Sequence, residues 1–312
     1  MTELIIDWNH MTQKEWDRHL SQAEHCSFQQ AWAYGTIFNR DKVNVNRFVV
    51  YDGLDPIGMG QVVTRRFFGF LKVALLLRAP LWLRPVSADI KKEVLEKIRL
   101  HFPLKSFNLF AFSPDETESH QSYKDMGFRR VITGYSTVLL DINRTEDDLW
   151  QNLYGKTRTS IRKAEKSHMD IQYGDHHHYH IDWLLKHEKK QQKDKKYQGL
   201  PTKLVKSYGR NSAAGAGVFT AFALDEGMRE PLAGALFLRH GRCATYHIGW
   251  NGPEGRNRNA LHLLLWKTIL KLKSEGVVMI DLGGINTEDG ADIARFKLGF
   301  GGTPISLIGT YM

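Results

Sequence analysis

The sequence predicts an α/β protein made of two similar domains, and a repeated series of landmarks is the first reason. In the first half, an apolar segment leads to a turn at Gly53 and to a second segment that opens at Pro56. The second half repeats this pattern around Gly227 and Pro231. Apolar segments joined by a glycine-containing turn are typical of β-hairpins.

A Gly-Phe pair closes each copy of the pattern. The pairs are Gly127-Phe128 and Gly299-Phe300, and they follow the two prolines at nearly equal separations. Landmarks that recur in the same order indicate an internal duplication, with chance as the competing explanation.

The segments between these landmarks predict the same elements in both halves. Apolar residues at helical spacing predict helices near residues 88–100 and 258–273. Short apolar runs then predict strands at 107–112 and 277–282, short helices end near Gly127 and Gly299, and final strands follow at 136–142 and 304–312. Helices alternating with strands after a hairpin favour a sheet covered by helices.

The domain boundary is expected near residues 141–147, where Thr145 and the acidic residues after it form a helix-start signal. We therefore expect domains at 1–144 and 145–312. The last strand, at about 303–312, is expected to complete either its own sheet or that of the first domain. A charged helix at 182–196 is the largest insertion in the second half.

The composition is that of a globular protein with a surplus of positive charge. Of the 312 residues, 42% are hydrophobic and 25% charged, and the formal net charge is +9. This charge favours polyanionic partners such as tRNA, phosphorylated precursors or an anionic membrane surface, although a merely basic soluble enzyme is the alternative. The most apolar stretch, residues 73–83, is too short to span a bilayer, so no transmembrane segment is expected.

Cysteine and histidine usage predicts no metal site. Cys26 and Cys243 have no metal-ligand spacing, and the start of the chain does not resemble a signal peptide, so a cytoplasmic location is expected. The histidines at 176, 177, 178 and 180 fit an exposed polar loop better than a zinc site.

Two segments carry candidate binding residues. Arg158, Arg162 and Lys166 fall on one face of a predicted helix, where they could bind phosphates or form an ordinary solvated surface. The run Asp281-Leu-Gly-Gly284 follows a strand, where glycines allow a ligand to approach the backbone, or form a simple turn. His247 and Trp250 are candidates for the site or for the core.

Five motifs spread over the chain together resemble the Fem family. They are residues 27–32 (Ser-Phe-Gln-Gln-Ala-Trp), 156–158 (Lys-Thr-Arg), 161–166 (Ile-Arg-Lys-Ala-Glu-Lys), 281–285 (Asp-Leu-Gly-Gly-Ile) and 296–302 (Phe-Lys-Leu-Gly-Phe-Gly-Gly). Members of this family extend peptidoglycan stem peptides with amino acids taken from aminoacyl-tRNA. The resemblance implies two tandem acetyltransferase-like (GNAT) domains, here in the short form without a helical tRNA arm.

The resemblance also implies partners and residue roles. The donor would be aminoacyl-tRNA, the acceptor an amine of a muropeptide or related molecule, and no cofactor would be needed. In the Phe296-Lys297 pair, the lysine would stabilise the oxyanion that forms on the ester carbonyl, and Asp281 could orient the attacking amine. The substrate-binding set would be Trp32, Lys156, Arg158, Arg162, His247, Trp250, Gly283 and Gly284.

Two other functions remain open. One is an acyl-CoA-dependent N-acyltransferase acting on a small molecule or a polysaccharide precursor. Such enzymes hold pyrophosphate on an Arg-x-x-Gly-x-Gly/Ala loop, but Asn259 and Leu261 replace the glycines after Arg256. The other is a non-catalytic RNA- or phosphate-binding module, which lacks a recognised signature here.

Overall fold

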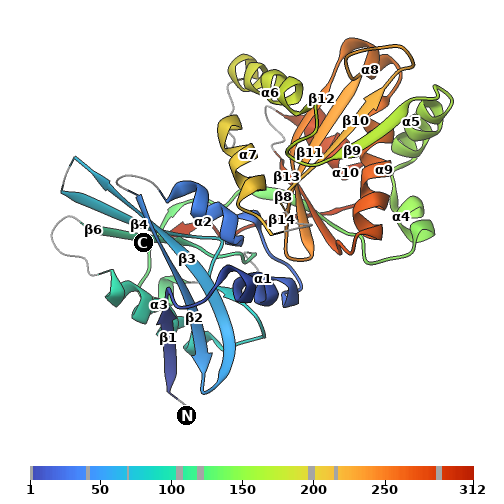
Figure 1. Cartoon of the computed structure of the whole chain (residues 1–312). Coiled ribbons are helices and arrows are strands. Elements are labelled where there is room, and N and C mark those ends of the chain that lie inside the picture. The colour runs from blue at the N-terminus through green and yellow to red at the C-terminus, as the bar shows by residue number, and fades with distance from the viewer. Residues whose placement is uncertain are drawn as a thin grey trace. The chain divides into compact units, whose positions relative to one another are not determined.

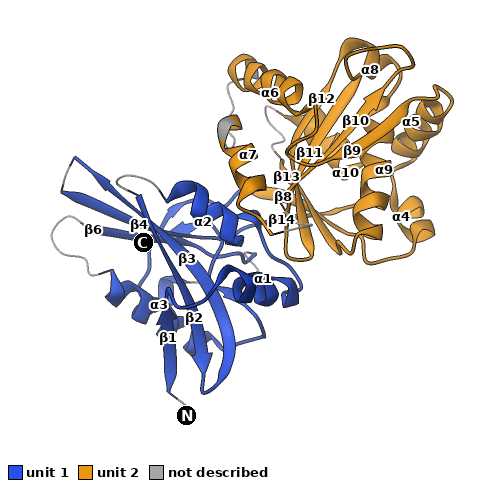
Figure 2. Ribbon diagram, viewed as in Figure 1, with its two compact units in different colours: residues 1–135, 306–312 blue, residues 136–305 orange. Residues whose placement is uncertain are grey.

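The computed structural model describes residues 3–39, 43–68, 70–102, 108–117, 123–195, 201–213, 217–285 and 290–312. The chain divides into two compact units, residues 1–135 with 306–312, and residues 136–305 (Figure 2). The sequence placed the division after Arg144. The structure places it before Ser136, because the strand at 136–141 pairs in the sheet of the second unit.

The first unit contains a mixed sheet (Figure 1). Its strands are β1 (Leu4–Trp8), β2 (Val43–Asp52), β3 (Asp55–Phe67), β4 (Leu71–Leu77), β5 (Leu81–Trp82), β6 (Asn108–Ser113), β7 (Arg130–Ile132) and β15 (Thr310–Tyr311). Their order in the sheet is β1-β2-β3-β4-β6-β15-β7, and β5 pairs with β3. β4 and β6 run parallel, and the other neighbours run antiparallel.

The helices of the first unit begin at capping residues. They are α1 (Gln13–Gln22), the 3-10 helix η1 (Phe28–Gln30), α2 (Trp32–Phe38), α3 (Ala88–His101) and the 3-10 helix η2 (Tyr123–Met126). Thr12 closes a capping box with Glu15 at the start of α1, and the Ser87 hydroxyl accepts from the Ile90 amide at the start of α3. α3 buries Val94, Leu95 and Ile98 in one core with the sheet residues Phe110 and Phe112, as the helical spacing predicts.

The second unit repeats this arrangement around a seven-stranded sheet. Its strands are β8 (Ser136–Asp141), β9 (Asp170–Gly174), β10 (Gly217–Leu224), β11 (Ala233–His240), β12 (Cys243–Asn251), β13 (Met279–Ile285) and β14 (Thr303–Ser306). The order is β14-β8-β13-β12-β11-β10-β9, and β12 and β13 form the parallel pair.

Seven helices accompany this sheet in the described residues. They are α4 (Glu146–Asn152), α5 (Gly155–Glu165), α6 (Ile181–Lys195), α7 (Thr202–Arg210), α8 (Pro253–Asn257), α9 (Ala260–Ser274) and α10 (Ala291–Leu298). The Thr145 hydroxyl accepts from the Asp148 amide, which confirms the predicted helix start. α9 lies between α5 and β11, and its apolar residues are buried in the core of this unit.

The two sheets confirm the predicted duplication. A hairpin, a third antiparallel strand, a helix and a parallel strand occur in each: β2, β3, β4, α3 and β6 in the first unit, and β10, β11, β12, α9 and β13 in the second. The strand beside the parallel pair is β15 in the first unit and β8 in the second. The chain therefore exchanges these strands. The predicted strand at 136–142 joins the second sheet, and the predicted C-terminal strand divides into β14 and β15, of which β15 returns to the first.

Candidate active site

The candidate site of the second unit lies where β12 and β13 stop pairing. The two strands pair in parallel only from Cys243 to Thr245 and from Met279 to Asp281. Beyond this segment β12 has a bulge, because Leu236 pairs with Ile248 while Phe237 pairs with Tyr246. His247 is therefore left out of the ladder. Bulges of this kind redirect side chains, and ligands bind at the carboxyl ends of such strands.

Lys297 points from α10 to the end of β13. Its ammonium group donates a hydrogen bond to the carbonyl oxygen of Gly284 at 2.8 Å. Burial lowers the pKa of Lys297 to about 8, and the negative charge of Asp281 partly opposes this shift. The structure thus brings together Lys297, Asp281 and Gly284, three residues that the sequence singled out.

Gly283 makes room for this lysine. Its φ of +80° is in the left-handed region, and a Cβ atom there would lie 3.2 Å from Lys297 Nζ and 3.2 Å from the Tyr246 carbonyl oxygen. The backbone conformation therefore favours glycine, and a side chain here would push the ammonium group by a few tenths of an ångström.

Asp281 organises the same turn. It is 8% exposed, and its Oδ1 accepts from the Gly283 amide at 2.8 Å and from the Thr137 hydroxyl of β8. These bonds fix the glycine turn against the sheet and keep a negative charge close to the lysine. Asp281 therefore positions the turn and the lysine.

Phe296 anchors the helix that carries Lys297. It packs edge-on against Phe300, with ring centroids 5.4 Å apart, and against His262 at 4.9 Å. Its side chain is half-buried against the core. The structure therefore gives Phe296 a packing role that holds its neighbour in place.

His247 and Trp250 lie in different surroundings in the structure. His247 occupies the bulge of β12, where burial lowers its pKa to about 4, so the imidazole is neutral at pH 7. Trp250 packs on α6, with its ring 4.7 Å from that of Trp183 and 4.2 Å from that of His187. His247 is thus near the candidate site, and Trp250 helps to attach α6 to the sheet.

The sequence did not single out Tyr246, which precedes the bulge. Its hydroxyl lies against Gly249, where a Cβ atom would be 1.6 Å away, and burial followed by the charge of Glu188 raises its pKa. Glu188 is 4% exposed on α6 and accepts from the Gln192 side chain at 2.9 Å. No motif marks this pair, because only the packing of α6 on β12 brings the two residues close.

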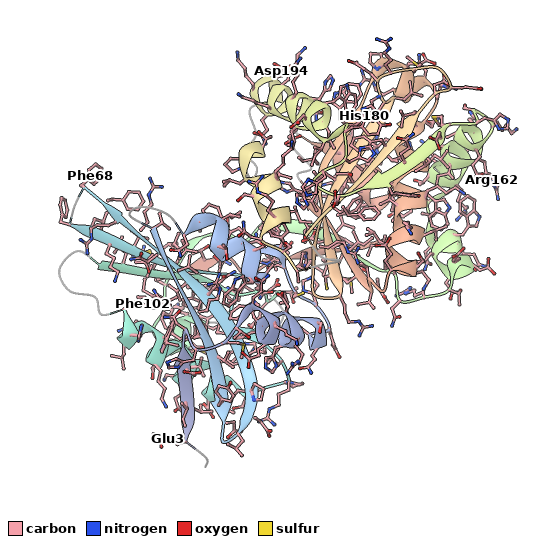
Figure 3. All side chains as sticks on the ribbon, in the orientation of Figure 1. Glu3, Phe68, Phe102, Arg162, His180 and Asp194 are labelled. Carbon is pink, nitrogen blue, oxygen red and sulfur yellow. The ribbon has the colours of Figure 1, made fainter. Side chains whose placement is uncertain are left out.

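The basic helix α5 divides its arginines between two roles. Arg158 is half-buried and donates to the carbonyl oxygens of Gln151, at 2.8 Å, and of Leu153, at the end of α4. Arg162 is exposed (Figure 3). Its guanidinium lies 5.5 Å from the centre of the Trp150 ring. Lys156 is also exposed. Arg162 and Lys156 are therefore open to a polyanion, whereas Arg158 caps α4.

Trp32 belongs to the first unit. The Arg47 guanidinium lies 3.6 Å above its ring and donates to its carbonyl oxygen at 3.0 Å, and Trp16 packs edge-on against it at 6.0 Å. Burial lowers the pKa of Arg47 to about 10. In the structure, Trp32 therefore stacks on a half-buried arginine.

The loop that would hold the pyrophosphate of acyl-CoA is tied to other groups. Arg258 donates to both oxygens of Asp225, at 2.5 and 3.2 Å, and to the carbonyl oxygen of Ser167 at 3.0 Å. Asn259 adopts a left-handed φ of 54° at the start of α9. Arg258 therefore anchors the loop to the strand end at Asp225.

The histidine-rich segment forms the turn between β9 and α6, as predicted, but it is not exposed throughout, because His180 is only 7% exposed. Ligand atoms of Asp175, His176 and His177 lie within 4.8 Å of one another, and of these atoms an Asp175 carboxylate oxygen takes part in a hydrogen bond within the turn. The Asp175 carboxylate accepts from the His177 amide at 2.7 Å, and His178 Nδ1 accepts from the His180 amide at 3.2 Å.

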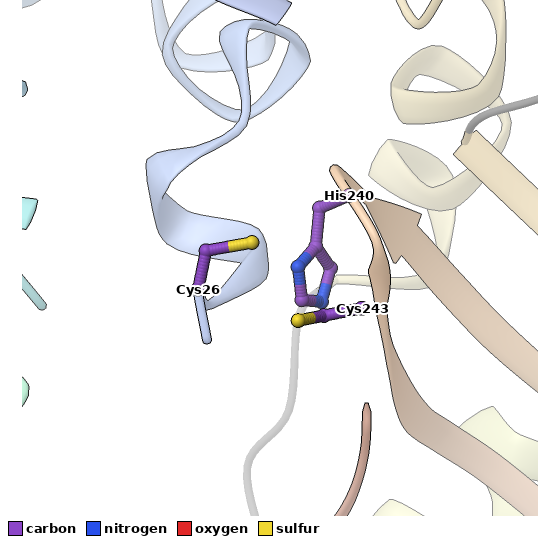
Figure 4. Close-up of side chains that lie close together, drawn as sticks. All are labelled: Cys26, His240 and Cys243. Carbon is purple, nitrogen blue, oxygen red and sulfur yellow. The ribbon is translucent and has the colours of Figure 1, made fainter. Parts of the chain in front are cut away.

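The strand ends at His240 and Cys243 bring two further candidate ligands close together (Figure 4). His240 Nε2 and the Thr245 hydroxyl are joined by a hydrogen bond of 3.0 Å. Within this unit, His240 and Cys243 thus pair where β11 and β12 meet, and the His240 ring already forms a hydrogen bond.

The sequence predicts no transmembrane segment, and a helix that spans a membrane must be both long and apolar. In the described ranges, every helix is too short or too polar to cross a lipid bilayer.

Comparisons with known proteins agree with this architecture. Residues 152–297 match the family model of the acetyltransferase (GNAT) domain. No curated protein matches the sequence. Over 98% of this chain and 96% of the other, the structure is similar to the crystal structure of FemX, with a TM-score of 0.82 and 13% identity.

Two further structures share the fold at a lower level. A tandem GNAT protein from the clavulanic acid biosynthesis pathway has a TM-score of 0.56 and 14% identity, over 99% of this chain and 98% of that one. L-PGS from Bacillus licheniformis has a TM-score of 0.53 and 12% identity, over 96% and 90%. Residues 152–297 therefore correspond to an acetyltransferase (GNAT) domain, in a chain that shares its fold with FemX and with a tandem GNAT protein.

Proposed function

We propose that this protein transfers an amino acid from aminoacyl-tRNA to an amine of a peptidoglycan-precursor peptide or a related acceptor. The observation that carries the proposal is the Lys297 ammonium group, held beside Gly283 and Gly284 at the end of β13. The neighbour named FemX supports a Fem-type reaction, and the likeness to L-PGS extends the range of acceptors to be tested.

In this reaction the acceptor amine attacks the carbonyl carbon of the aminoacyl ester. Negative charge develops on the carbonyl oxygen, an amide bond forms, and the ester bond to the tRNA ribose breaks. The proton lost by the amine balances the proton gained by the ribose oxygen. An ammonium group already fixed and partly desolvated stabilises the oxyanion more than the neutral ester, so it lowers the barrier.

The direct test is mass spectrometry of the purified protein with a panel of amines, supplied either with charged tRNA or with acyl-CoA. Aminoacylated product from charged tRNA alone is the expected outcome. Product from acyl-CoA alone would show that the donor is acyl-CoA and would favour an acyl-CoA-dependent N-acyltransferase. The Arg258–Asp225 ion pair argues against that function, because it ties up the loop that would hold the pyrophosphate.

The pH dependence of the transfer rate should reflect the ionisation of Lys297. Because burial lowers its pKa to about 8, the ammonium form predominates below pH 8 and is lost as the pH rises through this value. The fraction of neutral acceptor amine rises over the same range, so single-turnover rates should give a bell-shaped profile. In Lys297→Arg the falling limb near pH 8 should disappear, because a guanidinium stays protonated. An unchanged limb in this variant would assign it to another group.

The two arginines of α5 should respond differently to substitution. Arg158→Ala should lower the free energy of unfolding by about 1–2 kcal/mol in urea titrations, because the carbonyl groups at the end of α4 lose a charged donor. Arg162→Ala should leave stability nearly unchanged, weaken tRNA binding, and reduce the slope of log affinity against log salt by roughly 1. Lys163→Ala, on the same helix and also exposed, is the matched control. If the parent, Arg162→Ala and Lys163→Ala show the same slope of log affinity against log salt, this helix face is an ordinary solvated surface.

A further inference from the structure

The tip of the β3–β4 hairpin exposes two phenylalanines. Phe67 pairs with Leu71 at the end of the ladder, and the Phe70 amide donates to the Phe67 carbonyl oxygen at 3.2 Å. Beyond this pair lie Phe68, which is labelled in Figure 3, and Phe70. Phe68 is 86% exposed and Phe70 is 60% exposed. Phe68 also has a φ of 51°, a conformation that favours glycine or asparagine. Neither burial nor turn geometry explains aromatic residues here, and exposed apolar clusters mark interaction sites.

Positive charge surrounds the base of this tip. Arg65 and Arg66 are exposed, and Lys72 lies directly opposite Arg66 in the ladder. Like charges in opposite positions of a sheet repel each other. The sequence from 56 to 77 contains no acidic residue, and no carboxylate of the described residues forms an ion pair with these three cations. An anionic partner would remove this repulsion.

A cavity of about 300 Å³ lies on the same sheet face as Arg66 and Lys72, which both line it. Asn44 and Thr64, which pair with each other across β2 and β3, complete its lining. Thr64 is only 4% exposed, and its hydroxyl has no hydrogen-bond partner among the described residues. Two cations, an amide and an unsatisfied hydroxyl are the groups that bind a phosphate.

We propose that this hairpin docks the protein on an anionic lipid bilayer. Phe68 and Phe70 enter the boundary between headgroups and acyl chains, while the cavity at Arg66 and Lys72 receives the phosphate of an anionic phospholipid. Phe68 is two positions after Arg66, just beyond the end of β3, and two extended residues span about 7 Å. This span matches the roughly 5–10 Å depth to which peripheral proteins bury apolar side chains.

The test is co-sedimentation of the full chain with vesicles of phosphatidylglycerol and phosphatidylcholine, and with vesicles of phosphatidylcholine alone. Binding is expected only to the anionic vesicles, and it should weaken with salt, which screens the charges. Phe68→Ser/Phe70→Ser and Arg66→Gln/Lys72→Gln should each reduce the partition coefficient at least about tenfold. These residues lie outside the candidate active site, so transfer to a soluble acceptor should be unchanged.

Matched controls separate this surface from general stickiness. Leu54→Ser removes an apolar side chain that is 96% exposed at the other end of β3. Lys14→Gln/Lys92→Gln removes two exposed charges on α1 and α3. Both controls should bind like the parent. Equal loss in the control and hairpin variants, or parental binding by Phe68→Ser/Phe70→Ser, would overturn the proposal.

Insertion depth gives a second readout. Lipids brominated in the acyl chains should quench the added fluorescence of Phe68→Trp, but not that of Leu54→Trp. If the parent ignores anionic vesicles while Arg66→Gln/Lys72→Gln loses affinity for tRNA, the hairpin is a nucleic-acid contact and the membrane proposal fails. Vesicle binding is measured without donor or acceptor, so its failure leaves the proposed transfer chemistry untouched.

Discussion

Lys297→Met is expected to lower the single-turnover rate of aminoacyl transfer about a hundred- to a thousandfold, or roughly 3–4 kcal/mol. The variant removes the ammonium group that donates to Gly284 and keeps much of the side-chain length. Folding should be little affected, because Phe296 keeps its packing against Phe300 and His262. The rate is measured with the enzyme in excess of charged tRNA and with a saturating acceptor, and thermal unfolding is followed in parallel.

Lys297→Arg serves as the control for charge. It keeps a cation but changes the donor geometry, so partial activity is expected. A methionine variant that transfers at the parental rate would remove Lys297 from the mechanism and leave only the acyltransferase fold.

Gly283→Ala is expected to reduce transfer about ten- to a hundredfold. The new Cβ atom would stand 3.2 Å from Lys297 Nζ and from the Tyr246 carbonyl oxygen, so the ammonium group must move. A displacement of the group that we propose to stabilise the oxyanion is costly, because such stabilisation requires a fixed position. The left-handed φ adds about 1 kcal/mol of instability.

Gly276→Ala is the matched control for this backbone effect. Gly276 has a φ of +84°, close to that of Gly283, but a Cβ atom there would meet nothing within 4 Å. Both variants should lose similar stability in urea titrations, and only Gly283→Ala should lose activity. An equal loss of activity in the two would mean that general stability, and not the position of the lysine, limits the rate.

Much of the fold could be predicted because it depends on local patterns. Helical spacing predicted a helix near residues 88–100, where α3 spans Ala88–His101, and the Thr145 signal predicted the start of α4. The repeated hairpins predicted two α/β units, since alternating apolar strands around a glycine turn specify their own pairing.

The exchange of β8 and β15 could not be read from the same patterns. Both are short strands, and a short apolar run does not state which sheet it joins. Long-range contacts decide which sheet a strand joins, as Thr137 shows. Its hydroxyl donates a hydrogen bond to Asp281, a residue 144 positions later in the second sheet.

By itself the sequence determined the duplicated α/β architecture, the basic helix and the Phe296-Lys297 and Asp281-Gly283-Gly284 motifs, because these depend on residue type and spacing. Only the tertiary structure decided that Lys297 reaches Gly284, that Arg158 caps α4, and that Trp250 packs on α6. The lowered pKa of Lys297 likewise comes from burial, and burial depends on elements distant in the chain.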